Sequence, residues 1–385
     1  MNDFEYHNPV RIVLGKGTIA RVGDLVAPSE KVMFLYGGGS IKKNGVYGQV
    51  VDALAKHEVV EFAGIEPNPR YRTCMKAVEM AKQNGVDLLL AVGGGSVLDA
   101  VKFIAAAMTY EGKDPWKILT SHGSVVNSAM PLGTILTLPA TGSEMNINSV
   151  ISRESTDEKL AFGSPHVYPR FSILDPEVTY TLPRNQLRNG LVDAFVHVME
   201  QYATHSVKSP LQDRQAEAVV KTLIEIAPAV LAEEPDYDAR ASFMWCTTQA
   251  LNGLIGCGVV QDWTTHMIGH ELTAFFGVAH AESLAIVLPG VWEHQFHNKQ
   301  GKLAQLARRT WHVTSGDEAS QAKAGIEKTE AFFHSVDMPT RLGDYGIDEA
   351  GIRKVVDRFT KRQALLGEHQ NINAQEVGAI LESRL

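Results

Sequence analysis

Short apolar runs alternate with helical segments along the first half of the chain. An apolar run of strand length is followed by residues whose apolar positions recur every three or four residues, and the alternation then repeats. Alternating strands and helices form parallel sheets covered by helices. The first half is therefore predicted to be an α/β domain. Its expected strands are residues 31–36, 86–92, 132–138 and 171–174, and its expected helices are residues 71–83 and 97–108.

The second half has only the helical spacing. From about Leu187 onward the apolar residues recur at three and four positions, and one short segment, residues 284–288, is ambiguous between strand and helix. A polar, proline-containing turn near residues 180–188 is the expected boundary. The fold class is therefore α/β plus all-α, with one domain at residues 1–182 and a helical domain at residues 183–385.

Composition limits the kind of partner. The 385 residues carry a formal net charge of −8, and no basic run is longer than Lys42-Lys43, which argues against nucleic acid or an anionic membrane. A small molecule is the expected partner. The three cysteines form no CxxC pair, so neither a disulfide framework nor a thiolate metal site is expected. The start of the chain has no apolar signal region, no segment is apolar enough to span a membrane, and a cytoplasmic location is expected.

Two of the expected strands end in the same glycine-rich turn. Residues 37–40 and residues 93–96 both read Gly-Gly-Gly-Ser and both lead into a helical segment. Such a turn leaves backbone N–H groups at a helix start uncovered, which suits a phosphate. A tight turn that needs glycine only for its backbone is the alternative. Two such turns in one domain favour a nucleotide, although neither GxGxxG nor a P-loop is present.

The first turn also predicts which dinucleotide binds. An acidic side chain after the second strand of a dinucleotide site binds the ribose 2′-OH and repels the 2′-phosphate of NADP. Here the stretch contains Gly37, Gly38, Gly39 and Ser40, two lysines follow, and no acid occurs before Asp52. If a dinucleotide binds, NADP(H) is therefore the preferred form. A third polar turn at residues 137–144 and the residue Asn68 are either further contacts to the nucleotide or simple turns.

Histidines at helical spacing indicate a metal site. His266 and His270 lie four residues apart in a helical segment, as do Asp193 and His197 in an apolar one. A carboxylate inside an apolar helix is costly unless it is paired or bound to a metal. With His280, in a turn ten residues after His270, one carboxylate and three imidazoles could surround one Zn²⁺ or Fe²⁺. The proposed ligands are Asp193, His197, His266 and His280.

Each of these residues also has a structural explanation. Asp193 could cap its helix or pair with Arg188, and His266 or His270 could pair on the surface with Asp262 or Glu271. The remaining histidines have no comparable setting and are expected on the surface: His7, His57, His122, His166, His205, His294, His297, His312, His334 and His369.

These motifs together resemble those of a known family. The segments YGGGSIKKNGV, AVGGGSVLDAVKFIA, TLPATGSEMN, NGLVDAFVHVMEQY and DWTTHMIGHELTAFFGVAHAESLAIVLP are similar to those of the iron-containing alcohol dehydrogenases, which are related to glycerol dehydrogenase and dehydroquinate synthase. The chain looks closest to the bacterial NADPH-dependent aldehyde reductase and butanol dehydrogenase subgroup. The resemblance implies a Rossmann-like N-terminal domain and a helical, metal-binding, dehydroquinate synthase-like C-terminal domain.

The resemblance also implies roles for individual residues. It gives the same four metal ligands and places His270 beside the nicotinamide and the substrate, with His266 and His270 as the catalytic residues. It places an aspartate of NAD-preferring relatives at Gly38, and it shows one departure, Ala281, where many members have glycine. The implied cofactor contacts are Gly94, Gly95 and Ser96 on the pyrophosphate, Asp99, Thr137, Leu138 and Thr141 along the nucleotide, and Asn68 and Lys159 near the ribose or nicotinamide.

The expected activity is hydride transfer between NADP(H) and a primary alcohol/aldehyde pair. One divalent metal would polarise the substrate oxygen, and His270 would either relay a proton or only pack beside the metal. Polyol oxidation of the glycerol dehydrogenase type is the alternative, and a dehydroquinate synthase-like lyase is a more distant one. The resemblance further implies a homodimer.

Overall fold

The computed structural model describes residues 1–385, which form two compact units. One unit combines residues 7–183 with residues 234–248 and is called the sheet unit below. The other combines residues 1–6, 184–233 and 249–385 and is called the helical unit. The chain therefore leaves the sheet unit, returns to it once, and leaves it again, a path that hydrophobic periodicity alone does not indicate.

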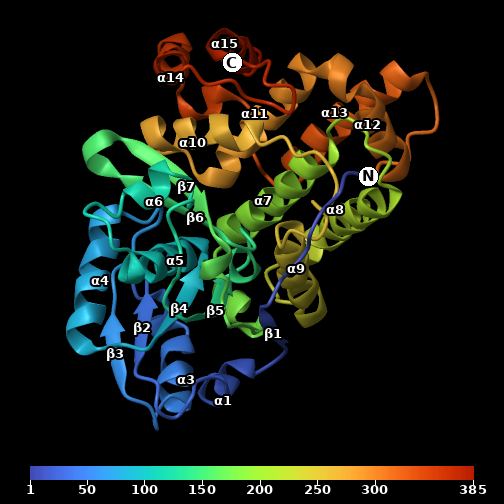
Figure 1. The fold of residues 1–385 in the computed structure, drawn as a ribbon. Helices are drawn as coiled ribbons and strands as arrows, with labels where there is room; N and C mark the ends of the chain where they lie inside the picture. The colour runs from blue at the N-terminus through green and yellow to red at the C-terminus, as the bar shows by residue number, and fades with distance from the viewer. The chain divides into compact units, whose positions relative to one another are not determined.

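The sheet unit is built on six parallel strands in the order β1-β8-β5-β4-β2-β3 (Figure 1). Its central strand β4 is buried along six of its seven residues, as expected for a parallel sheet covered on both faces. The strands of the sheet are β1 (Arg11–Leu14), β2 (Val32–Tyr36), β3 (Val59–Phe62), β4 (Leu88–Gly94), β5 (Leu132–Leu138) and β8 (Phe171–Leu174). The predictions of a parallel sheet and of its four apolar strands are confirmed.

Helices and an added hairpin complete this unit. The helix α5 packs against β4, and α4 packs beside α5. An antiparallel pair, β6 and β7, lies outside the main sheet. Both strands of that pair and the edge strands β1 and β3 are partly exposed, which explains why no apolar run marked them. These elements are α1 (Val22–Leu25), α2 (Ser40–Lys43), α3 (Val46–Ala53), α4 (Tyr71–Asn84), α5 (Gly95–Thr109), α6 (Lys117–Thr120), β6 (Asn148–Arg153) and β7 (Glu158–Gly163).

The helix α9 (Tyr237–Ala250) belongs to the sheet unit over most of its length. Met244 is part of the same apolar core as the strands. The Arg240 guanidinium, buried, donates to the carbonyl of Thr179, and the Thr248 hydroxyl donates to the buried Glu144 carboxylate. These contacts fasten the returning segment to the sheet unit.

The helical unit consists of helices without a sheet (Figure 1). The ambiguous segment, residues 284–288, lies inside α11, so the possibility of a strand there is wrong, because its neighbours on both sides continue the helix. No helix in the chain combines the length and the apolar character needed to cross a membrane. The helices are α7 (Arg184–Tyr202), α8 (Pro210–Val230), α10 (Thr264–Phe276), α11 (His280–His294), α12 (Phe296–Arg309), α13 (Glu318–Ser335), α14 (Glu349–Arg362) and α15 (Ala374–Glu382).

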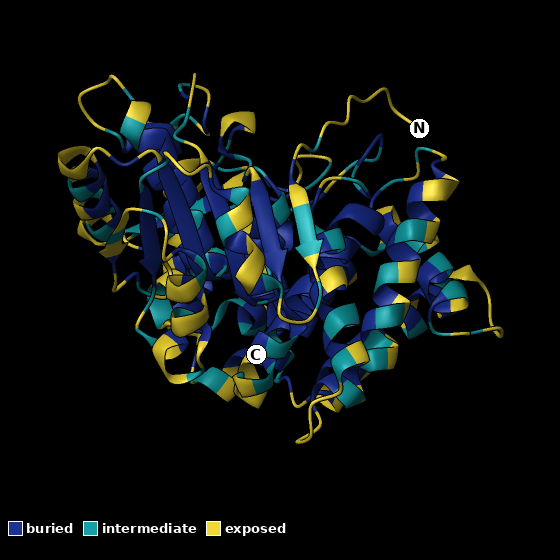
Figure 2. Cartoon of the chain, turned by 90° about the horizontal axis from the view of Figure 1, so that it is seen from below, coloured by how far each residue is buried: buried dark blue, intermediate teal, exposed yellow.

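Burial identifies α7 as the central helix of this unit. Every residue from Gly190 to Tyr202 is buried, so the helix has no solvent face over that stretch. It packs against α8 and α11. Figure 2 shows other helices that carry exposed residues, and the exposed N-terminal tail. Polar side chains on α7 therefore need partners inside the unit.

Candidate metal and cofactor site

Three imidazoles of the helical unit surround one carboxylate oxygen. The distances from Oδ1 of Asp193 are 3.7 Å to Nε2 of His197, 4.0 Å to Nε2 of His266 and 3.6 Å to Nε2 of His280. Donor atoms of Asp193, His266 and His280 all lie within 4.8 Å of one another. These distances are too long for hydrogen bonds. They are a few tenths of an ångström above the roughly 3.3 Å between neighbouring ligands of a tetrahedral ion with bonds of about 2.0 Å.

Local structure explains why these four residues meet. Asp193 and His197 lie one turn apart on α7, and His266 lies in the first turn of α10. Gly277, in the left-handed conformation with φ of 69°, ends α10 and lets the chain reverse, so that His280 is the first residue of α11. The buried Ala281, where many family members have glycine, does not prevent His280 from facing Asp193.

The arrangement fits a divalent cation. Oδ1 of Asp193 is buried and has no hydrogen-bond partner, a costly state for a carboxylate oxygen unless a cation faces it. Burial lowers the pKa of His197 to about 4, so its imidazole is neutral near pH 7, the form that binds metals. One carboxylate and three imidazoles are a donor set that suits Zn²⁺ or Fe²⁺.

The groups that could have paired with Asp193 and His266 have other partners. The Arg188 guanidinium lies 2.5 Å from the Glu282 carboxylate and does not pair with Asp193. Asp262 binds the Lys299 ammonium at 2.9 Å, and Glu271 binds arginines of α14. His266 is buried, so it is not a surface partner of either acid.

Glu200 is a candidate supporting residue of the metal site that sequence reasoning missed. Its carboxylate is hydrogen-bonded to Nδ1 of His266 and accepts the backbone N–H of His266 at 3.2 Å. Burial, with the nearby Asp262 carboxylate, raises the pKa of Glu200 well above its usual value. The hydrogen bond fixes the ring so that Nε2 of His266 faces Asp193. Carboxylates that orient ligating histidines in this way typically tune metal affinity.

Replacing Glu200 by glutamine should weaken metal binding by roughly 10–100-fold, because the amide orients His266 less strongly than the carboxylate. Competition with a chromophoric chelator measures this affinity. Glu217→Gln is the matched control, since Glu217 is a buried carboxylate hydrogen-bonded to Tyr202 and Arg309. Equal metal affinities of the two variants would show that Glu200 does not support the site.

His270 lies beside the metal-site imidazoles. Its ring centroid is 6.2 Å from that of His266 and 5.4 Å from that of His280. It is less buried than His266, being only partly covered. The structure thus places His270 next to the proposed ligands, where a group acting on a substrate would have to be.

The second glycine-rich turn lies against the third polar turn of the sheet unit. A Cβ on Gly94 would lie 2.9 Å from Cβ of Leu138, and a Cβ on Gly95 would lie 2.6 Å from Oγ1 of Thr141. Both glycines are therefore required for this close approach. Gly94 caps α5 and has no side chain that could accept from the N–H groups of the first turn, which includes Ser96. This is the geometry that accepts a phosphate.

Gly95→Ala should destabilise the sheet unit by about 1–3 kcal/mol, because the new methyl group overlaps Thr141. Urea unfolding of the variant, compared with Gly38→Ala, measures the effect, since a Cβ on Gly38 would meet no atom within 4 Å. The double variant Gly95→Ala, Thr141→Ala should recover part of the loss. Equal stabilities of the two single variants would contradict the close approach.

Asp99, on α5 after the second glycine-rich turn, makes hydrogen bonds within the sheet unit. Its Oδ1 accepts the Ser143 hydroxyl at 2.7 Å, and its Oδ2 accepts the Val150 N–H at 3.0 Å. The Lys102 ammonium, also buried, binds Ser143 at 2.9 Å. Burial raises the pKa of Asp99 and lowers that of Lys102 to about 8. Asp99 therefore holds the turn after β5 in place through its own hydrogen bonds.

Asn68 and Lys159, far apart in sequence, meet in the structure. Nζ of Lys159, on β7, donates to Oδ1 of Asn68 at 3.0 Å. Asn68 has φ of 53°, in the left-handed region that asparagine tolerates, and the bridge between Arg70 and Ser152 joins its loop to β6. The two residues that the resemblance assigns to the same half of the cofactor thus form one polar pair.

The first glycine-rich turn has an acidic neighbour in space that is distant from it in the sequence. Glu61, on β3, accepts the Tyr47 hydroxyl at 2.8 Å and the Lys42 ammonium at 3.1 Å, and the Tyr36 hydroxyl also donates to it. Burial alone would raise the pKa of Glu61, but these donors outweigh it and lower the pKa. A carboxylate therefore lies near this turn, and Lys42 neutralises it. No acid follows the turn in the sequence before Asp52, but pairing of β2 with β3 brings Glu61 beside it in space.

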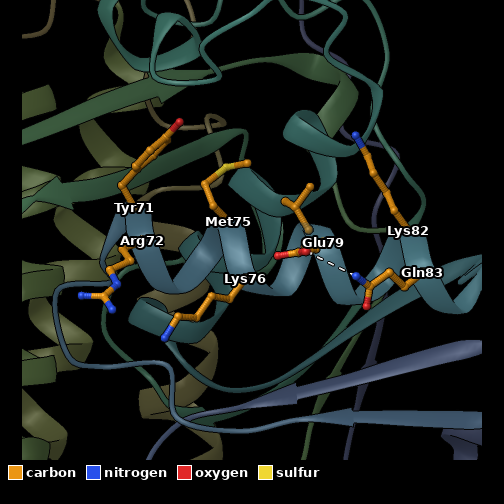
Figure 3. A pocket seen from close by; sticks show the side chains of 8 residues that line it. Tyr71, Arg72, Met75, Lys76, Glu79, Lys82 and Gln83 are labelled. Carbon is orange, nitrogen blue, oxygen red and sulfur yellow. Dashed lines mark hydrogen bonds between the residues drawn. The ribbon is translucent and has the colours of Figure 1, made fainter.

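A separate hollow of about 640 Å³ lies along α4 and contains none of the candidate residues (Figure 3). Tyr71, Met75 and Val78 supply its apolar part, and Glu79 and Gln83 are hydrogen-bonded at 3.3 Å on its rim. It has neither the imidazoles nor the glycine turns described above.

The chain belongs to the iron-containing alcohol dehydrogenase family. The family profile described as iron-containing alcohol dehydrogenase matches residues 9–176, and the profile for the C-terminal part of the Fe-containing alcohol dehydrogenases matches residues 189–385. This membership confirms the family resemblance, the fold class and the expected class of enzyme, an oxidoreductase of the alcohol dehydrogenase type.

Individual relatives are similar over their full length. The NADPH-dependent aldehyde reductase YqhD of Escherichia coli K12 is 51% identical over 100% of both chains. A probable NADH-dependent butanol dehydrogenase 1 of Bacillus subtilis is 41% identical over 100% of both chains. The crystal structure of Escherichia coli YqhD superimposes with a TM-score of 0.98, at 50% identity, over 100% of this chain and 99% of that one.

Proposed function

We propose that this protein is a metal-dependent oxidoreductase that reduces short- to medium-chain aldehydes to primary alcohols with NADPH. The observation that carries the proposal is the buried, unpartnered oxygen of Asp193 facing three imidazole nitrogens at 3.6–4.0 Å. A relative that is 51% identical over the whole chain carries the name NADPH-dependent aldehyde reductase, which supports the substrate and cofactor. In this proposal residues 1–182 hold the nucleotide and residues 183–385 hold the metal.

The preference for NADPH rests on the first glycine turn, because relatives alone do not decide it. A relative at 41% identity is named as NADH-dependent. In this chain position 38 is glycine, and Lys42 and Lys43 follow it. The one nearby carboxylate, Glu61, is held by Lys42 and two tyrosine hydroxyls, so it is less able to repel a 2′-phosphate.

Side chains of this protein would hold the metal and deliver a proton during the reaction. Asp193, His197, His266 and His280 would hold one Zn²⁺ or Fe²⁺, which supplies Lewis acidity to a carbonyl oxygen while the nicotinamide supplies the hydride. Reduction of an aldehyde also consumes one proton. His270, beside these imidazoles, is the group proposed to deliver that proton to the substrate oxygen.

His270→Ala should lower kcat by about 10²-fold or more while the metal content stays the same, because a positioned proton donor contributes about that factor. Steady-state kinetics across pH and metal analysis of the same preparation measure both quantities. The exposed His297→Ala, on α12, is the matched control. An unchanged kcat and pH profile would mean that His270 only packs beside the metal.

An uncharged substrate fits the helical unit better than a phosphorylated one. Residues 189–198 and 259–288 contain no lysine or arginine. The arginines that reach this region bind acids: Arg188 binds Glu282 at 2.5 Å, and Arg362 binds Glu271 at 2.5 Å. A lyase acting on a phosphorylated sugar would need cations for its substrate, so aldehyde reduction is favoured.

The function is tested by metal analysis of the purified protein together with NADPH oxidation on a panel of C2 to C8 aldehydes. Chelation should abolish the oxidation, and Zn²⁺ or Fe²⁺ should restore it. Turnover that survives complete removal of metal would overturn the proposal. Glycerol oxidation that clearly exceeds butanal reduction would instead indicate a polyol dehydrogenase.

We also propose that the protein is a cytoplasmic homodimer. The three cysteines are unpaired and buried, in keeping with a reducing compartment, and the resemblance to the family suggests a dimer. Light scattering after size exclusion should give twice the mass of one chain. A mass of one chain at micromolar concentration would contradict the dimer.

A further inference from the structure

We propose that His205, Glu368 and His369 form a second divalent-metal site in the helical unit, independent of the Asp193 cluster. His205 lies in the segment after α7, and Glu368 and His369 lie in the segment between α14 and α15. One donor atom from each residue lies within 4.8 Å of the others. The rings of the two histidines are stacked, with centroids 5.2 Å apart and planes at 24°. The sequence placed both histidines among surface residues, because their partner Glu368 is distant from His205 in the chain.

The carboxylate of this group is buried, although the imidazole beside it is accessible. The Glu368 side chain is 2% exposed, and the His205 side chain is 42% exposed. Nδ1 of His205 lies 2.9 Å from Oε2 of Glu368, and the backbone N–H of His205 donates to the same oxygen at 2.6 Å. An ion could therefore reach the site from solvent and complete its coordination with water.

The charges behind Glu368 favour a cation. Oε1 of Glu368 accepts the buried Lys299 ammonium at 2.8 Å, and the same ammonium binds Asp262 at 2.9 Å. Among these three side chains one buried cation thus faces two carboxylates, which leaves one negative charge, and Oε2 of Glu368 is otherwise met by the backbone N–H and the imidazole of His205. Burying an uncompensated charge is costly, and a divalent ion at Oε2 would offset it without displacing Lys299.

Nδ1 of His205 and Oε2 of Glu368 are 2.9 Å apart, the distance of a hydrogen bond, so an ion would replace that bond. Neighbouring ligands of a tetrahedral ion with bonds of about 2.0 Å lie roughly 3.3 Å apart, so these two atoms would need to separate by only a few tenths of an ångström. Binding would require the proton on Nδ1 of His205 to leave. Two imidazoles and one carboxylate suit Zn²⁺, Ni²⁺ or Cu²⁺.

Zinc counting in a background without the first site tests the proposal. In Asp193→Asn, equilibrium dialysis against Zn²⁺ and elemental analysis should leave one zinc per chain. Adding His205→Gln or His369→Gln should weaken that binding by more than the 10–100-fold typical of losing a supporting residue. Adding His294→Gln should not, since His294 pairs only with Glu376, at 2.7 Å, and is part of no such group.

Three results would overturn the second site. Two come from zinc counting: an Asp193→Asn protein that binds no zinc, and zinc retained equally in all three double variants. Zinc X-ray absorption of Asp193→Asn alone, which needs no change at the second site, should show two imidazoles in the coordination shell. A spectrum without them would also overturn the proposal. Failure of the first site is distinguishable, because the wild-type chain and Asp193→Asn would then bind the same number of ions.

Discussion

An Asp193→Asn variant is expected to lose its active-site metal and to reduce aldehydes about 10²–10⁴-fold more slowly. Asp193 is the one acidic member of the cluster, and all three imidazoles face its Oδ1. Asparagine keeps the shape but removes the negative charge. A Lewis acid contributes several kcal/mol to a reaction that builds negative charge on oxygen, and each 1.36 kcal/mol is a factor of ten in rate.

Thermal unfolding separates this role from a structural one. Without metal, the wild-type chain carries a buried carboxylate oxygen with no hydrogen-bond partner, so the variant should be at least as stable as the metal-free wild type. Added Zn²⁺ should raise the melting temperature of the wild type by mass action much more than that of the variant. Any ion at the second site would contribute equally to both proteins.

Asp337→Asn is a suitable control, since Asp337 is an exposed carboxylate paired with Arg184. It should keep both metal and activity. If Asp193→Asn retained full activity, or lost stability in the absence of metal, Asp193 would be a packing residue and the metal site would lie elsewhere.

The ligand set could be predicted because helical spacing carries direct spatial information. Asp193 and His197, like His266 and His270, are one turn apart, so sequence alone placed each pair on one helix face. Glu200 follows Asp193 by seven residues and lies on the same face of α7. A carboxylate in a helix this apolar could have indicated a buried partner. Only the structure identifies that partner as His266.

Contacts between distant segments could not be predicted in this way. Apolar runs identified the inner strands, but strand order is not encoded in any one run, and the neighbour of β2 at the edge of the sheet is β3, which carries Glu61. For the same reason the sequence did not predict that α9 returns to the sheet unit or that His205 meets Glu368. In each case the contact joins two segments that are distant in sequence, and neither segment has a strong apolar pattern that would predict it.

Gly38→Asp should shift the preference from NADPH toward NADH by about 10²-fold in the ratio of kcat/KM values. Two unit charges 4 Å apart repel by about 4 kcal/mol at an effective dielectric of 20. Gly38 is exposed, so solvent screening reduces this repulsion for a 2′-phosphate. The new carboxylate would also accept hydrogen bonds from a ribose 2′-OH, and a net difference of about 2.7 kcal/mol corresponds to the expected factor.

The structure indicates that this variant will fold. A Cβ on Gly38 would meet no atom within 4 Å, and Gly38 is not among the residues with positive φ. Gly48→Asp is the matched control. Gly48 is also exposed with open space around it, and the substitution adds the same charge to the sheet unit. It should leave the cofactor ratio unchanged.

Removing the charge of the neighbouring Glu61 tests the same turn with a shift expected in the opposite direction. Glu61→Gln removes the carboxylate that holds Lys42 at 3.1 Å, so the ammonium becomes available to a phosphate and the preference for NADPH should increase several-fold. Kinetics with both cofactors at one aldehyde concentration measure both variants. If Gly38→Asp and Glu61→Gln both left the ratio unchanged, the 2′-phosphate would not lie at this turn. Opposite shifts from one added and one removed negative charge would place it there.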